Sequence, residues 1–329
     1  MRVFDKLVLA TTLLALCVVV LGAFVRLSDA GLGCPDWPGC YGSLSVPQSE
    51  SAIQHAQTAF PDKPMETHKA WKEMIHRYFA GTLGLLVLAI FVIGWRLRRE
   101  IKVSVWLPTL LLLLIAFQAA LGMWTVTLLL KPAVVTAHLI GGMSTLALLT
   151  WIAHRHLGMI PTRVMQSESL RFWVRGALVV LFVQIFLGGW TSTNYAALAC
   201  TDFPTCHGVW FPEMDFSNAF HWIRELGQDA TGEALQLSAY TAIQWTHRVG
   251  ALVTFIYLGL LGLRLRNQPQ LKQLAHFLLG LLVVQIGLGI ANLLLHLPLV
   301  LAVGHNMGAA LLLITVVVLN SKITVLKRG

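Results

Sequence analysis

The chain has 329 residues, of which 56% are hydrophobic and 12% charged, and its formal net charge at pH 7 is +9. A typical soluble domain has roughly 25% charged residues, so this composition excludes an ordinary soluble protein and predicts a polytopic membrane protein. The positive charge forms no stripe interleaved with aromatic residues, so we expect no nucleic-acid partner.

Eight apolar segments each have about the 20 residues that a helix needs to cross a hydrocarbon core of roughly 30 Å. We therefore predict an all-α integral membrane protein with eight transmembrane helices. In chain order, the segments cover residues 7–25, 75–95, 103–125, 133–153, 172–191, 240–263, 274–295 and 299–319.

The lysines and arginines between these segments predict the orientation. Sixteen of the 24 lie on one side of the predicted membrane and eight lie on the other, where they are spread through two long loops. Cytoplasmic connections carry the excess of positive charge, so both termini are expected in the cytoplasm. The two long loops are then expected on the outer side.

Four of the five cysteines form two pairs in these outer loops, Cys34 with Cys40 and Cys200 with Cys206, whereas Cys17 lies inside the first helix. An oxidising compartment favours disulfides at the two pairs. A metal site is the weaker alternative, because five residues separate the cysteines of each pair and no histidine has a fixed spacing to them.

The chain carries an internal repeat, which predicts a tandem duplication of a four-helix unit. An even number of helices per unit gives both copies the same orientation, as two bundles side by side. We assign residues 1–160 and 161–329 to the two bundles. The matches pair residues 34–42 with 200–208, His76-Arg77 with His247-Arg248, Gln118 with Gln285, and His138 with His305, at offsets of 166 to 171.

Four histidines, His76, His138, His247 and His305, lie near the outer ends of even-numbered helices, and each has a counterpart in the other half. A lone histidine on an apolar face is usually a satisfied core residue, but ionisable groups inside a membrane indicate function. Two imidazoles per half are too few for a closed zinc site. They complete a haem, which supplies four equatorial nitrogens itself, so we predict one haem iron site per half towards the outer face.

Charged neighbours accompany the first histidine of each half. Arg77 and Arg248 could pair with haem propionates, or they could reach towards lipid headgroups. Glu73 stands one helical turn outward of His76, whereas the equivalent residue of the second half is Gln244. A carboxylate in one half alone suggests proton handling there; the alternative is a solvated glutamate favoured by the helix dipole.

Glycines on the histidine-bearing helices would leave room for a flat macrocycle. Close packing between membrane helices selects the same residues, so both interpretations stay open. The glycines are Gly81, Gly84, Gly141, Gly142, Gly250 and Gly308.

The duplicated helices, the histidine pairs, Glu73-x-x-His76-Arg77 and the run from Gly31 through Cys34 to Cys40 resemble the bacterial type of haem A synthase over essentially the whole chain. The resemblance implies an oxidoreductase that oxidises a ring methyl of haem O to a formyl group, giving haem A for cytochrome oxidase. It also implies a location in the bacterial inner membrane.

In that family the pair corresponding to His247 and His305 holds a resident haem b. The pair corresponding to His76 and His138 faces the substrate, so residues 1–160 would be the catalytic half. The glutamate matching Glu73 and the disulfide matching Cys34 and Cys40 are important for turnover there.

The implied partners are haem O, haem A, haem O synthase, cytochrome oxidase or its assembly factors, and the lipid bilayer. A second copy of this chain, in a homo-oligomer, is a possible further partner. Two alternatives use the same histidines. A quinol-linked haem-b electron carrier would not need Glu73 in one half only. A haem transporter or handling protein would form no formyl haem.

Overall fold

The computed structural model describes residues 3–101, 105–156 and 164–325. Within these ranges eight helices are long and apolar enough to cross a membrane, which confirms the predicted number and indicates a multi-pass membrane protein. They are α1 (Val3–Leu27), α3 (Thr67–Arg96), α5 (Trp106–Thr127), α6 (Pro132–His156), α7 (Glu168–Thr193), α9 (Leu237–Leu265), α10 (Lys272–Leu294) and α11 (Leu299–Lys322).

Shorter elements that the hydropathy pattern did not predict lie between the long helices and after the last of them. The two strands pair in parallel, so the all-α prediction is confirmed apart from one three-residue ladder. The predicted boundary at residues 160/161 and the predicted helix start at 103 lie outside the described residues. The short elements are α2 (Glu50–Ala59), α4 (Arg98–Ile101), β1 (Val164–Gln166), the 3-10 helix η1 (Ala196–Leu198), α8 (Phe216–Ala219) and β2 (Ile323–Val325).

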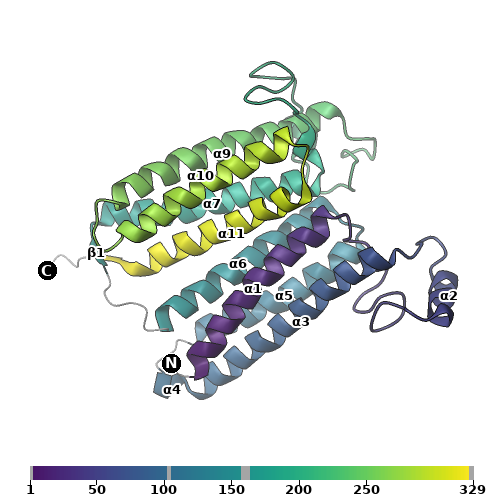
Figure 1. The fold of residues 1–329 in the computed structure, drawn as a ribbon, viewed down its shortest axis with the longest axis horizontal. Coiled ribbons are helices and arrows are strands. Elements are labelled where there is room, and N and C mark those ends of the chain that lie inside the picture. The colour runs from purple at the N-terminus through teal and green to yellow at the C-terminus, as the bar shows by residue number, and fades with distance from the viewer. Residues whose placement is uncertain (1–2, 102–104, 157–163, 326–329) are drawn as a thin grey trace.

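The long helices form two four-helix bundles that lie side by side (Figure 1). Helices α1, α3, α5 and α6 pack around one another in the first, and α7, α9, α10 and α11 in the second. The seam consists of α1 and α6 against α7 and α11. One apolar core extends through both bundles and the seam, and includes the fully buried Leu146, Leu149, Leu313 and Val316.

Helix α3 begins at Thr67, eight residues before its apolar segment. The additional turns are polar in sequence, but they bury Ala70, Glu73 and Met74. Ala70 and Met74 join an apolar cluster with Cys34 and Cys40 of the preceding loop. Packing against that loop therefore stabilises helical turns that hydropathy alone does not predict.

Both disulfide loops lie at the same end of the molecule, whereas the start of α1 and strand β2 lie at the other end (Figure 1). The two loops therefore face the same side of the membrane.

The charge distribution predicts that this side is the outer one. Alkaline phosphatase inserted at the exposed Lys63 or Thr231 should be active, because that enzyme folds only in an oxidising compartment. Green fluorescent protein inserted at the exposed Asn267 should fluoresce in the cytoplasm. Phosphatase activity at Asn267 and none at Lys63 would reverse the orientation.

Candidate functional site

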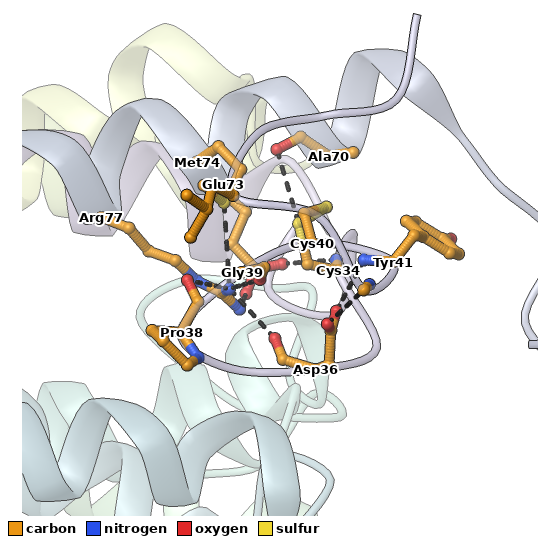
Figure 2. Close-up of a disulfide and its surroundings, with 12 residues drawn as sticks. Cys34, Asp36, Pro38, Gly39, Cys40, Tyr41, Ala70, Glu73, Met74 and Arg77 are labelled. Carbon is orange, nitrogen blue, oxygen red and sulfur yellow. Dashed lines mark hydrogen bonds and ion pairs between the residues drawn. A yellow bond between two sulfur atoms is a disulfide. The ribbon is translucent and has the colours of Figure 1, made fainter. Parts of the chain in front are cut away.

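Glu73 is a buried carboxylate that ties α3 to the first disulfide loop (Figure 2). One of its oxygens accepts the backbone N–H of Cys34 at 2.9 Å, and the other accepts from Nη2 of Arg77 at 2.5 Å. Glu73 is only 5% exposed, which excludes a solvated helix-entry glutamate. It makes no hydrogen bond to His76 among the described residues.

Arg77 completes this contact by binding the loop backbone. Its Nη1 donates to the carbonyl oxygens of Asp36 at 3.0 Å, Pro38 at 3.3 Å and Gly39. A guanidinium has five N–H donors, so one arginine can bind several backbone carbonyls at once. The sequence did not predict this contact, because the carbonyls lie some forty residues earlier in the chain.

The loop approaches α3 so closely that one position requires glycine. A Cβ atom added at Gly33 would lie 2.5 Å from the carbonyl carbon of Lys69 and 2.7 Å from the nitrogen of Ala70. Backbone atoms cannot move aside as a flexible side chain can. Gly33 therefore permits the bond between Glu73 and the neighbouring N–H of Cys34.

In the second half, Gln244 occupies the position of Glu73 and also binds the loop. Its Oε1 accepts the N–H of Cys200, and its Nε2 donates to the carbonyl of Ala197. Arg248 donates to the carbonyls of Thr205 at 2.7 Å and Cys200 at 3.0 Å. The loop contact therefore does not require a negative charge.

Each loop also contains an aspartate that caps its tight turn. Asp36 accepts the N–H groups of Tyr41 at 2.6 Å and Gly42 at 2.8 Å. The carboxylate of Asp202 similarly accepts from His207 at 2.8 Å and from Gly208 at 3.0 Å. Hydrogen bonds from the Thr205 hydroxyl and then from the Gly208 N–H lower the pKa of Asp202.

Both predicted disulfides are present, joining Cys34 to Cys40 and Cys200 to Cys206. The second lies beside His207, which gives a cluster of three groups that bind metals in other proteins. A disulfide has no thiolate to offer, and the thiolate is the metal-binding form of cysteine. This cluster therefore does not form a metal site while the disulfide is intact.

The four predicted histidines lie in two pairs within the bundles. His76 of α3 and His138 of α6 are close enough to interact electrostatically, as are His247 of α9 and His305 of α11. Each pair therefore draws its two imidazoles from two helices of one bundle.

Each imidazole packs against a glycine of a neighbouring helix. A Cβ added at that glycine would lie 3.1–3.5 Å from Cε1 of the ring, closer than ordinary van der Waals contact in three of the four cases. The contacts join Gly22 to His76, Gly122 to His138, Gly188 to His247, and Gly289 to His305.

Glutamine side chains contact two of the four imidazoles at Nδ1. The amide of Gln118 is oriented so that both its nitrogen and its oxygen have hydrogen-bond partners. Its nitrogen then donates to Nδ1 of His138 at 2.8 Å. Nε2 of Gln184 lies 3.0 Å from Nδ1 of His247. Gln118 belongs to the sequence repeat, although no role was predicted for it. Gln184 has no glutamine counterpart in the first half, so the repeat could not reveal it.

His305 has a glutamine neighbour too, with a different contact. Its Nδ1 donates to the backbone carbonyl of Gln285 at 3.2 Å, and its Nε2 lies 3.4 Å from the amide nitrogen of that residue. Nδ1 of His76 is buried and has no hydrogen-bond partner among the described residues.

Comparison with known proteins identifies the family. The family model described as "Cytochrome oxidase assembly protein" (COX15-CtaA) matches residues 5–317. The chain is 49% identical to the heme A synthase of Shewanella oneidensis over 316 residues, which cover 94% of this chain and 93% of that protein. It is 30% identical to the heme A synthase of Caulobacter vibrioides, with 90% and 89% covered, and 26% identical to that of Paracoccus denitrificans, with 90% and 81% covered. The chain therefore belongs to the COX15-CtaA family of cytochrome oxidase assembly proteins.

Proposed function

We propose that this chain is a haem A synthase, an oxidoreductase that converts a ring methyl of haem O into a formyl group. The observation that carries the proposal is the occurrence of two pairs of neighbouring imidazoles in a chain 49% identical to a protein named heme A synthase. Two imidazoles per site would hold a haem iron, whose macrocycle supplies the remaining ligands, and they are too few for a closed zinc site.

The residues around the imidazoles fit such a group. Each ring rests against a glycine, which leaves no side chain over that part of the imidazole. Gly141, Gly250 and Gly308 face glutamine amides, so helix packing explains these three glycines better than room for a macrocycle.

The two halves would have different tasks. Residues 1–160 would hold the substrate haem O between His76 and His138, and residues 161–329 would hold a resident haem b between His247 and His305. A bound haem b supplies a one-electron redox centre. The proposed duplication is supported by the equivalent loop contacts of Glu73 and Gln244.

The charged residues would act around the substrate. Glu73 would accept a proton or position water, and its ion pair with Arg77 holds the carboxyl group in place at the outer end of α3. The N–H groups of Arg77 and Arg248 that do not bind the loops would pair with haem propionates.

The proposed setting is the bacterial inner membrane, with both termini in the cytoplasm and both haem sites towards the outer face. Haem O synthase would supply the substrate, and cytochrome oxidase or its assembly factors would receive haem A.

Pigment analysis tests the reaction itself. Membranes that contain this chain and a source of haem O should accumulate haem A, detected after extraction by chromatography and mass spectrometry. A chain carrying His138→Ala should form none, because one of the two imidazoles for the substrate is missing. Bound haem without any formyl product from the wild-type chain would favour an electron carrier or a haem-handling protein.

Ligand substitutions test the assignment of the halves. His247→Ala or His305→Ala should remove the resident haem b from the purified protein, measured as haem per chain by the pyridine haemochrome method. The exposed His55→Ala is a suitable control, since it lies in the outer loop. Loss of resident haem only after changes at His76 or His138 would mean that the two halves have the opposite tasks.

Glu73→Gln separates the charge of this residue from its contact with the loop. Gln244 binds its own loop without charge, so a glutamine at position 73 should keep the bond to Cys34. If the carboxylate handles protons, haem A formation should fall by roughly 10²-fold while the disulfide still forms. Glu66→Gln, a change to an exposed acid at the start of the same helix, should leave the rate unchanged. Full activity in Glu73→Gln would mean that Glu73 does not handle protons and serves only to bind the loop.

A further inference from the structure

Three of the four imidazoles share a local arrangement of histidine, glycine and glutamine. A glycine follows the histidine by three residues, and the amide of a glutamine from a neighbouring helix fills the space beside it, so that an added Cβ would collide with the amide. The sets are His138 with Gly141 and Gln118, His247 with Gly250 and Gln184, and His305 with Gly308 and Gln285.

His76 is the exception. The residue three positions after it is Phe79 instead of glycine. In α7, Gln184 precedes Gly188 by one helical turn, and the residue one turn before the equivalent Gly22 in α1 is Val18. The surroundings of His76 thus lack both the amide and the space for it, and Nδ1 of His76 has no hydrogen-bond partner among the residues that the structure describes.

A hydrogen bond to the second ring nitrogen fixes the tautomer and the orientation of a metal-binding imidazole. An amide suits this task, because it can rotate to present its oxygen to an N–H or its NH₂ group to a lone pair. Loss of such a partner typically weakens metal binding about 10- to 100-fold. Without a partner, an imidazole can turn away from the iron more easily.

We infer that Gln184 is a positioning residue that makes the pair of His247 and His305 a permanent haem holder. Val18 and Phe79 leave His76 free to release its haem when product is exchanged for substrate. The inference rests on the proposed function, since it requires haem at both pairs. It adds that the difference between resident and exchangeable haem arises from the contacts of one ring nitrogen in each half.

The first experiment uses the purified full chain loaded with haem b and measures haem transfer to apomyoglobin. Gln184→Leu should increase the rate of loss of the resident haem about tenfold or more. It should also shift the electron paramagnetic resonance signal of the low-spin ferric haem, because the ring of His247 can reorient. The matched control is the exposed Gln270→Leu, in the connection between α9 and α10, which should change neither readout.

Gln184→Glu distinguishes positioning from simple packing. A carboxylate at this position accepts from Nδ1–H of His247 and makes the ring a stronger donor to iron. Haem retention should therefore approach the wild-type level, while the midpoint potential of the resident haem should fall below the wild-type value. Loss of haem from Gln184→Glu as fast as from Gln184→Leu would contradict a positioning role for residue 184.

The reciprocal change supplies His76 with a partner. In a His247→Ala chain, which leaves the first pair as the only complete one, Val18→Gln combined with Phe79→Gly should slow haem loss to apomyoglobin about tenfold. Val18→Ala with Phe79→Gly provides the same space without an amide and should not slow it.

Two results would overturn the inference in distinguishable ways. If Gln184→Leu keeps the wild-type rate and spectrum while His247→Ala loses its haem, the inference is wrong and the proposed function stands. If His247→Ala itself keeps the resident haem, the ligand assignment within the proposed function fails, and the inference fails with it.

Discussion

The main constraint on this site is that two disulfide loops enter the apolar ends of the bundles, where their backbone groups must find partners within the protein. A buried amide without a hydrogen bond costs roughly 2–7 kcal/mol. One turn of helix meets this requirement in each half, through Glu73 and Arg77 in the first and Gln244 and Arg248 in the second. A histidine directly precedes each arginine, so docking of the loop also fixes the helical turn that carries the imidazole.

The same contact is made by different hydrogen bonds in the two halves. Hydrogen bonds to charged groups contribute about 1.5–3 kcal/mol, against about 1 kcal/mol for neutral pairs. Glu73 makes one bond of the first kind to the backbone of its loop, and Gln244 makes two of the second kind to the other loop. The carboxylate of Glu73 thus has a structural role in holding the loop, and this role is compatible with a part in proton transfer.

The sequence predicts the membrane helices well, because each needs about 20 apolar residues and little else. It predicts the disulfides because the charge rule places both cysteine pairs in outer loops, and it predicts the histidine pairs because the repeat marks them. It does not predict the early start of α3, where polar turns are stabilised by an apolar cluster under the loop. The bonds of Arg77 to loop carbonyls were also missed, since backbone acceptors leave no signature in sequence.

The sequence does not predict the contacts between glutamine amides and imidazoles, for a related reason. Gln118 and Gln285 are visible in the repeat, but a neutral amide in an apolar helix suggests no chemistry until its neighbours are known. Gln184 breaks the repeat and could be recognised only from its contact with His247. Features that repeat in both halves of the chain are easily found in the sequence, whereas the consequences of differences between the halves require the structure.

These differences are concentrated around His76. The first half gains a carboxylate one turn outward of this histidine and lacks the amide that contacts Nδ1 in the second half. Both changes alter polar contacts and leave the helical scaffold intact. An electron-transfer site benefits from ligands that stay bound to the iron. A site that must bind a substrate and release its product requires at least one ligand that can detach from it. On the proposed function, two bundles that differ in the polar contact of one imidazole would meet both requirements within a single fold.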